Sequence, residues 1–349
     1  MMTQYWSVDE TNEAAAALAA GGIVAFPTET VYGLGGDAGN TQAVRRIFEA
    51  KGRPSDNPLI VHVEDVPAAM RLAKQVSDLE RLLMEAFWPG PLTLVLPVRE
   101  GVVSSLVTAG LDTVAVRVPA HEVARELIAA SGRPIAAPSA NRSGRPSPTL
   151  ATHVRGDLDG RIDGLLDGGP TGVGLESTVV QVVGDRIHIL RPGGVTREML
   201  RQAVGERAVV DGADSQAAES AASQEQAPRS PGVKYAHYAP QGELLLVAGN
   251  PADMIAAVQA QVAEAKARGL RVGVLACAEH APRYEADAVL DFGSRSEPEA
   301  AAQSLYALLR ECDERGLDFI VAEGYDERGI GAALMNRLRK AAGGRVLQV

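Results

Sequence analysis

The sequence has few cysteines, few aromatic residues and no long apolar run, and these shortages exclude several classes of protein. Only two cysteines, Cys277 and Cys312, occur in 349 residues, which excludes a disulfide-stapled secreted domain and a cluster of metal-binding cysteines. The longest apolar stretch, residues 14–26, contains two glycines and is shorter than the ~20 residues that a membrane helix needs. No Lys or Arg precedes Arg45, so a secretory signal is not expected. We therefore expect a soluble cytoplasmic protein without a membrane segment.

Positive charge is also in the minority. The chain has 34 Lys and Arg against 44 Asp and Glu, a formal net charge of −10. A protein that binds nucleic acid through its overall charge usually carries more positive than negative groups. Any RNA binding by this chain should therefore be weak and local. A length of 349 residues is enough for about two domains, each with its own core.

Familiar catalytic motifs are missing as well. The sequence has no GxxxxGK[ST] loop, no HExxH and no GxSxG elbow. Gly329 and Gly331 begin a G-x-G, but the third glycine is replaced by Leu334, so we interpret this motif as a turn that begins a helix. A phosphate site, if present, must be built from other elements.

One stretch without aromatic or branched aliphatic residues divides the chain. Residues 211–229, DGADSQAAESAASQEQAPR, cannot bury enough apolar surface to offset the entropy lost on ordering. We therefore predict a first domain over residues 1–210, a linker and hinge over residues 211–240, and a C-terminal domain over residues 241–349.

Apolar runs alternate with amphipathic helical segments in both domains, which predicts α/β folds. In the last domain, helices separate strands expected at residues 244–248, 271–276, 288–292, 319–322 and 345–349. This order is typical of a small, parallel, Rossmann-like sheet. In the first domain, we expect helices at 11–20, 41–50, 66–73, 77–87 and 121–130. Strands are expected there at 23–26, 59–63, 92–96, 113–118 and 135–137, with a hairpin of 179–183 and 186–190.

Segments rich in Pro, Gly, Ser and Thr flank these strands, where backbone groups can meet a ligand. They are PTETVYGLG (27–35), KGRPSDNPL (51–59), APSANRSGRPSPT (137–149), GLESTVV (174–180) and RPGG (191–194). Each alone could be an ordinary turn or mobile loop. Together they offer hydroxyl, amide and guanidinium donors, which can hold phosphate without a Walker loop.

Spacing singles out several side chains. Lys51 and Arg53 stand two residues apart, so in an extended segment they would leave on the same side and suit a polyphosphate. Thr113 and Arg117 share one face of their predicted strand, about 13 Å apart at ~3.3 Å per residue, a span that suits a nucleotide-sized ligand. The alternatives are a solvated basic turn, an ordinary surface face and, for His62, a purely structural role.

Taken in order, PTETVYGL, KGRPSDNPL, VRVP, PSAN, ESTVV and RPGG resemble the motifs of the YrdC-like threonylcarbamoyl-AMP synthase family. SPGVKYAHYAP, residues 230–240, followed by a Rossmann-like domain, is similar to the long two-domain members. The resemblance implies a twisted mixed sheet with flanking helices, joined by a linker to a small parallel α/β domain. It also implies an adenylyl transfer that makes L-threonylcarbamoyl-AMP and pyrophosphate from ATP, L-threonine and bicarbonate. The product would supply the machinery that modifies tRNA adenosine beside the anticodon.

The resemblance also implies roles for individual residues. Lys51 and Arg53 match the family's K-x-R and would be catalytic, with Lys51 near phosphate or carbamate charge. ATP would be bound by Arg53, Asn57, Thr113, Ser139, Asn141, Ser147, Arg191 and Tyr235. L-Threonine would be bound by Thr30, His62, Arg117, the backbone of Ala137, and Ser177, with Arg117 meeting its carboxylate. Mg²⁺ would arrive with ATP, held chiefly by phosphates. The hinge with Tyr235, His237 and Tyr238 would close as a lid.

Two other functions stay open at this point. A nucleotide-holding regulatory or nucleic-acid-binding module would use the same basic surface without turnover, and would show weak RNA binding lost at modest salt. Carbamoyl transfer from carbamoyl phosphate is performed by relatives inside larger proteins with cysteine-rich zinc modules, and this chain lacks those cysteines. The C-terminal domain is expected to regulate or gate the first.

Overall fold

The computed structural model describes residues 2–211 and 238–349. The chain divides into two compact units, which are described separately. The C-terminal unit contains the residues from 238 onward together with two short segments, Gly144–Ser147 and Val173–Leu175. Most of the predicted linker and hinge lies outside the described residues. Within the described ranges, every helix is too short or too polar to cross a bilayer.

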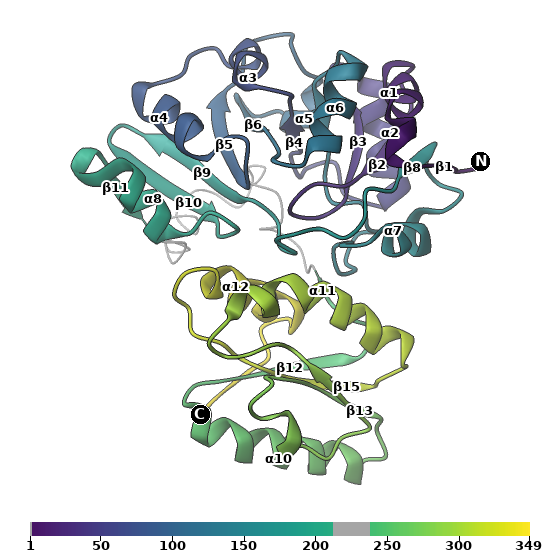
Figure 1. The fold of residues 1–349 in the computed structure, drawn as a ribbon, viewed down its shortest axis with the longest axis vertical. Coiled ribbons are helices and arrows are strands. Elements are labelled where there is room, and N and C mark those ends of the chain that lie inside the picture. Colours follow the sequence, from purple (N-terminus) through teal and green to yellow (C-terminus); the bar gives the residue numbers. More distant parts are fainter. Residues whose placement is uncertain (1, 212–237) are drawn as a thin grey trace. The chain divides into compact units, whose positions relative to one another are not determined.

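A mixed sheet of 11 strands runs through the described part of the N-terminal unit (Figure 1). Its order is β1-β8-β2-β3-β7-β4-β6-β5-β9-β10-β11. The strands are β1 Gln4–Trp6, β2 Val24–Phe26, β3 Gly33–Asp37, β4 Ile60–His62, β5 Leu92–Pro97, β6 Thr113–Arg117, β7 Ile135–Ala136, β8 Gly164–Leu166, β9 Thr178–Val183, β10 Arg186–Arg191 and β11 Val209–Asp211. Parallel and antiparallel pairs occur side by side, since β6 is parallel to β4 and antiparallel to β5. The predicted mixed sheet is confirmed.

Several helices of this unit begin or end at residues suited to cap them. They are α1 Thr11–Ala19, α2 Thr41–Lys51, α3 Val66–Leu72, α4 Asp78–Phe87, α5 Ser105–Thr108, α6 Glu122–Ser131, α7 Ala151–Leu158 and α8 Arg197–Val204. The Asn40 side chain accepts backbone N–H bonds at the start of α2, and Ser77 with Glu80 forms a capping box on α4. Gly52 ends α2 with a left-handed φ of 62°.

This cap makes one expectation wrong. Lys51 and Arg53 do not leave one side of an extended segment, because Lys51 is the last residue of α2 and Arg53 follows the left-handed turn at Gly52. The helix also suits a cation at this position, since its C-terminus carries the negative end of the dipole. The directions of the two cations are therefore set by a helix end and a turn. The rule that side chains alternate between the two faces of a strand does not apply to them.

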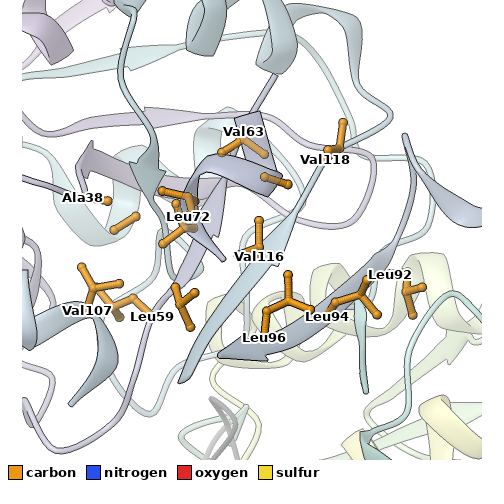
Figure 2. Packing of buried hydrophobic residues seen from close by; sticks show 14 of the residues in the cluster. Ala38, Leu59, Val63, Leu72, Leu92, Leu94, Leu96, Val107, Val116 and Val118 are labelled. Atoms are coloured by element: carbon orange, nitrogen blue, oxygen red, sulfur yellow. The ribbon is translucent and has the colours of Figure 1, made fainter. Parts of the chain in front are cut away.

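Side-chain alternation gives the N-terminal sheet two different faces. On the first face, Val116 packs in a large core with helices α2 to α5, as Figure 2 shows for Leu72, Leu94 and Val107. On the second face, Ala115 packs in a small separate cluster with Ile60, Val95 and Val179. Beside this cluster, α1 and α6 cover the part of the second face that carries Phe26 and Ala137. The predicted division of β6 into a valine face and an opposite face is confirmed.

The glycine-rich strand β3 was not expected, nor were β1, β8, β11, α5, α7 and α8. Gly35 explains why the GLGGD segment forms a strand despite its turn-like composition. A Cβ at this position would lie 2.7 Å from side-chain atoms of both Phe26 and Ile135. Glycine is therefore used here for close packing inside a sheet, a signal that composition alone does not distinguish from a turn.

The C-terminal unit has an all-parallel sheet in the order β14-β13-β15-β12-β16. Its strands are β12 Glu243–Ala248, β13 Val272–Ala276, β14 Ala288–Asp291, β15 Phe319–Glu323 and β16 Val346–Gln348, and its helices are α10 Pro251–Ala267, α11 Pro298–Glu314 and α12 Gly331–Ala341. In Figure 1, α10 lies on one side of these strands and α11 and α12 on the other. The predicted Rossmann-like architecture is confirmed.

Candidate active site

Arg117, at the end of β6, is a buried cation on the second face of the N-terminal sheet. It is 3% exposed. Its Nε donates to the carbonyl of Gly90 at 3.2 Å, its Nη1 donates to Thr30 Oγ1 at 2.9 Å, and its Nη2 forms an ion pair with Glu29 at 2.6 Å. A buried guanidinium is costly unless it is paired in this way. The predicted threonine-binding residues Thr30 and Arg117 are therefore in direct contact.

His62 lies beside Arg117 on the neighbouring strand, because β4 and β6 pair in parallel with these two residues opposite each other. Its ring is buried and meets Phe26 edge-on, with the ring centroids 6.2 Å apart. Its Nδ1 has no hydrogen-bond partner among the described residues. Burial, followed by the charge of Arg117, lowers the pKa of His62 to about 3. The imidazole is therefore neutral at physiological pH and serves as a hydrogen-bonding group.

This shift predicts a loss of stability in mild acid. The unfolded chain binds a proton at His62 with a pKa near 6.5, whereas the folded chain does so only near pH 3, so the free energy of unfolding falls as the pH drops below about 6.5. Between pH 7 and pH 5 the wild type should lose about 2 kcal/mol through this residue. Urea unfolding at both pH values should show that loss largely removed in His62→Gln. An equal loss in the variant would contradict the assignment.

Ser177 and Arg191 form a second group at the neighbouring strand ends. Arg191 Nη2 donates to the Ser177 carbonyl at 3.0 Å and to its hydroxyl at 3.2 Å. The Ser177 hydroxyl also bonds to that of Thr93 at 2.8 Å. The two segments meet closely, since a Cβ at Gly193 would lie 2.3 Å from the carbonyl oxygen of Glu176. The predicted adjacency of the ESTVV and RPGG segments is confirmed.

Strand β5 connects this second group to Arg117. Leu94 pairs with Val116 in the antiparallel register of β5 and β6, which places Thr93 next to Arg117 on the same face. Thr93 in turn is hydrogen-bonded to Ser177. Hydroxyl, imidazole and guanidinium groups from several strands therefore line one face of the sheet, over the apolar cluster around Ala115.

A third group gathers around Lys51, which is 3% exposed. Its ammonium donates to the backbone carbonyls of Ser139 and Asn141, and the Ser139 hydroxyl donates to Asn141 Oδ1 at 2.6 Å. The same loop is tied to the segment after β2, because the N–H of Ala140 donates to the carbonyl of Tyr32 at 2.8 Å. Since that segment also carries Thr30, it joins the Lys51 group to the Arg117 group.

The remaining predicted residues of this unit are held in different ways. Asn57 is fully buried, and neither atom of its amide has a hydrogen-bond partner among the described residues. A buried amide in that condition costs about 1–3 kcal/mol, so it is suited to bind a polar ligand. Arg53 is half-buried beside a carbonyl of its own loop. The N–H of Ala137 is bonded to Ile60, so its carbonyl is the backbone group it can offer. Thr113 begins β6, on the same face as Arg117.

Ser147 and the predicted hinge residues are not placed with this cluster. Ser147 belongs to the segment Gly144–Ser147, which groups with the C-terminal unit. Tyr235 and His237 lie outside the described residues, so the lid stays a prediction. Tyr238 is described and is buried within the C-terminal unit, where its ring lies 5.3 Å from that of Tyr306.

Sequence reasoning missed Glu29 and Thr93 as members of the cluster. Glu29 lies inside the PTETVYGL motif, but its pairing with Arg117 depends on a contact between segments far apart in sequence. Thr93 gave a weak signal, as a polar residue in the otherwise apolar strand LTLVL. A polar side chain inside an apolar strand is therefore the signal that could have found Thr93.

The fold and this cluster together define a YrdC-like α/β protein. The model of the Sua5/YciO/YrdC family, described as telomere recombination, matches residues 16–193. A second family model, described as the threonylcarbamoyl-AMP synthase C-terminal domain, matches residues 195–343. The chain therefore belongs to the threonylcarbamoyl-AMP synthase family, in its two-domain form.

Individual relatives agree along the whole chain. The threonylcarbamoyl-AMP synthase of Bacillus subtilis is 49% identical over 358 residues and is covered completely, as is this chain. That of Pyrococcus abyssi is 46% identical, covering 94% of this chain and 93% of its own. The crystal structure of P. abyssi Sua5 complexed with L-threonine has a TM-score of 0.91 at 44% identity and covers 100% of both chains. The family resemblance, the fold class and the enzyme class predicted from the sequence are confirmed.

Proposed function

We propose that this chain makes L-threonylcarbamoyl-AMP and pyrophosphate from ATP, L-threonine and bicarbonate. The adenylate then passes to the machinery that modifies tRNA adenosine next to the anticodon. The observation that best supports this proposal is the buried contact of Arg117 with Thr30, beside His62, on a face that also carries Ser177 and Arg191. P. abyssi Sua5, a relative that this chain covers completely, was solved with L-threonine.

L-Threonine binds at the Arg117 group in this proposal. The guanidinium pairs with the amino-acid carboxylate, which competes with Glu29 for Nη2 of Arg117. The hydroxyls of Thr30 and Ser177, the carbonyl of Ala137 and the neutral ring of His62 supply the hydrogen bonds that orient the threonine amine and side chain. The neutral state of His62 matters here, because a second cation next to Arg117 would repel the ammonium group of threonine.

ATP binds beside it, over the Lys51 group. We assign it to Arg53, Asn57, Thr113, Ser139, Asn141 and Arg191, while the roles of Ser147 and Tyr235 stay predictions from the sequence. Lys51 has two tasks in this proposal. Its ammonium holds the loop of Ser139 and Asn141 in place through their carbonyls, and its charge lowers the electrostatic cost of bringing phosphate and carbamate together.

The reaction needs little acid–base chemistry from the protein. The free threonine amine and bicarbonate condense to a carbamate and one water molecule. One carbamate oxygen then bonds to the α-phosphorus of ATP, and the bond from that phosphorus to pyrophosphate breaks. Because the carbamate is already anionic, no side chain has to remove a proton from it at this step. Cations and hydroxyls then act by positioning the reactants and neutralising their charge. Glu29, a carboxylate of this cluster, forms an ion pair with Arg117, which agrees with a reaction that needs no side chain as a base.

We propose that Mg²⁺ accompanies ATP and is held mainly by phosphate oxygens. The cluster fits a metal bound in this way, since its cations and hydroxyls suit phosphate and Glu29 is already paired. When bound, the ion would neutralise charge on the departing pyrophosphate. No side chain of the protein is assigned to it.

The purified protein, incubated with ATP, Mg²⁺, L-threonine and bicarbonate, tests the function. Pyrophosphate release and the adenylate, followed by mass spectrometry, should appear together and require all three substrates. Serine in place of threonine should lower kcat/KM about 10- to 200-fold, because the pocket would lose contacts to one methyl group. ATP binding without either product would favour the regulatory alternative, and product formed from carbamoyl phosphate would favour the carbamoyl-transfer alternative.

A further inference from the structure

In the C-terminal unit, three side chains with metal-binding atoms meet at the carboxyl ends of two neighbouring strands. Cys277 directly follows β13, His280 lies three residues later, and Glu323 is the last residue of β15. One thiol, one imidazole and one carboxylate ligand atom all lie within 4.8 Å of one another. The proposed reaction on the N-terminal sheet uses none of these residues.

The position of this cluster in the fold independently points to a ligand. In the order β14-β13-β15-β12-β16, the chain leaves β13 toward β14 at one edge, whereas it leaves β15 through α12 toward β16 at the other edge. Adjacent parallel strands whose connections run in opposite directions form a crevice at their carboxyl ends. Open α/β sheets bind their ligands in that crevice. Cys277 and Glu323 lie at its two sides.

The cluster is buried and pre-organised. Cys277 and Glu323 have no exposed surface, and the His280 side chain is 12% exposed, which leaves one route of access. Glu323 Oε1 accepts hydrogen bonds from Tyr284 at 2.7 Å and is 2.6 Å from Nδ1 of His280, while Oε2 accepts the N–H of Cys277 at 2.7 Å. A carboxylate so deeply buried is costly, and a cation coordinated beside it would offset that cost.

The donor set selects the kind of cation. A thiolate, an imidazole and a carboxylate are ligands of Zn²⁺, which commonly takes three protein ligands and keeps a fourth position open. Mg²⁺ and Ca²⁺ prefer oxygen ligands throughout and would not use the sulfur of Cys277. The small number of cysteines excludes a metal site made of several cysteines. It does not exclude this site, which uses one cysteine.

We propose that the C-terminal unit binds one Zn²⁺ through Cys277 Sγ, a ring nitrogen of His280 and the carboxylate of Glu323. Binding would replace the contact between His280 and Glu323 with two bonds to the metal, and would release the thiol proton of Cys277 to solvent. Tyr284 would keep its hydrogen bond to Glu323 and so hold the carboxylate in position. The fourth position would be left to water or to a small ligand in the crevice.

Full-length protein prepared free of metal tests this proposal, with Co²⁺ as the spectroscopic probe and Zn²⁺ measured against a chromophoric chelator. One equivalent of Co²⁺ should produce a thiolate-to-cobalt charge-transfer band, which Cys277→Ser should abolish. His280→Gln, a change at a partly exposed side chain, should raise the Kd for Zn²⁺ at least tenfold. Cys312→Ser is the matched control, because Cys312 is also buried in this unit but lies in α11, outside the cluster.

Circular dichroism of each metal-free variant shows whether the variant is folded. A folding defect is then not mistaken for the loss of a metal ligand. The proposal is overturned if folded wild type gives no thiolate band, if Cys312→Ser removes the band as Cys277→Ser does, or if the Kd for Zn²⁺ is the same in the wild type and in folded His280→Gln. Formation of threonylcarbamoyl-AMP is measured in a separate assay, so failure of either proposal can be recognised without the other.

Discussion

Arg117→Ala should lower kcat/KM for L-threonine by about 100-fold or more, with a smaller effect on the KM for ATP. The guanidinium is buried and has three partners, the carbonyl of Gly90, the hydroxyl of Thr30 and the carboxylate of Glu29. Removing one partner of a buried, hydrogen-bonded charge pair costs about 2–5 kcal/mol, and the variant would leave both Glu29 and the substrate carboxylate without a countercharge. Arg117→Lys should also be strongly impaired, because a single ammonium cannot reproduce the planar set of donors.

Arg133→Ala provides the matched control for this prediction. Its side chain is 53% exposed and makes a long ion pair with Asp37 at 3.7 Å, so its removal should change kcat/KM by less than about twofold. Both variants should be compared at a temperature at which circular dichroism shows them folded. A folded Arg117→Ala enzyme with an unchanged KM for threonine would mean that the carboxylate binds elsewhere.

Lys51→Met should reduce turnover about 100-fold and also destabilise the N-terminal unit. Met is close to Lys in length but has no donor, so the carbonyls of Ser139 and Asn141 would lose their shared partner. Each unsatisfied buried carbonyl costs about 1–3 kcal/mol, and the loop would no longer be fixed beside the phosphates. Urea unfolding measures the first effect, and pyrophosphate release under native conditions measures the second.

Lys74→Met is the control for Lys51, because Lys74 is exposed and should tolerate the same change with little effect on either measurement. The role assigned to Lys51 has two parts, and the experiment distinguishes them. Loss of stability without loss of turnover would leave Lys51 as a structural residue of the loop. Full stability and full turnover together would remove it from the site altogether.

Local patterns in the sequence were sufficient for most of the fold. Alternation in TVAVRVP separated the valine face of β6 from the face with Thr113 and Arg117, and the buried clusters on the two faces agree. The same rule failed at Lys51, where helix α2 continued one residue further than expected and Gly52 turned the chain. Alternation applies only inside a strand, and a helix end beside a glycine cannot be distinguished from an extended turn by spacing alone.

The candidate site could be predicted as a set of residues but not as an arrangement. Its contacts join segments that are distant in sequence, such as Thr30 with Arg117, and they depend on strand order and register. The motifs led us to expect a cavity at strand ends. The structure gathers the Arg117 and Ser177 groups at such strand ends on one face of the sheet, with β5 between them. Glu29 could be found only once that face was known.

Hydrogen–deuterium exchange tests the central claim that substrates bind across this face of the N-terminal sheet. L-Threonine together with a non-hydrolysable ATP analogue and Mg²⁺ should slow amide exchange in peptides covering residues 27–33, 137–143 and 176–180. In Arg117→Ala, L-threonine should no longer slow exchange in residues 27–33 and 176–180, whereas the ATP analogue should still slow it in residues 137–143. Slower exchange confined to residues 241–349, with the three N-terminal peptides unchanged, would contradict the account.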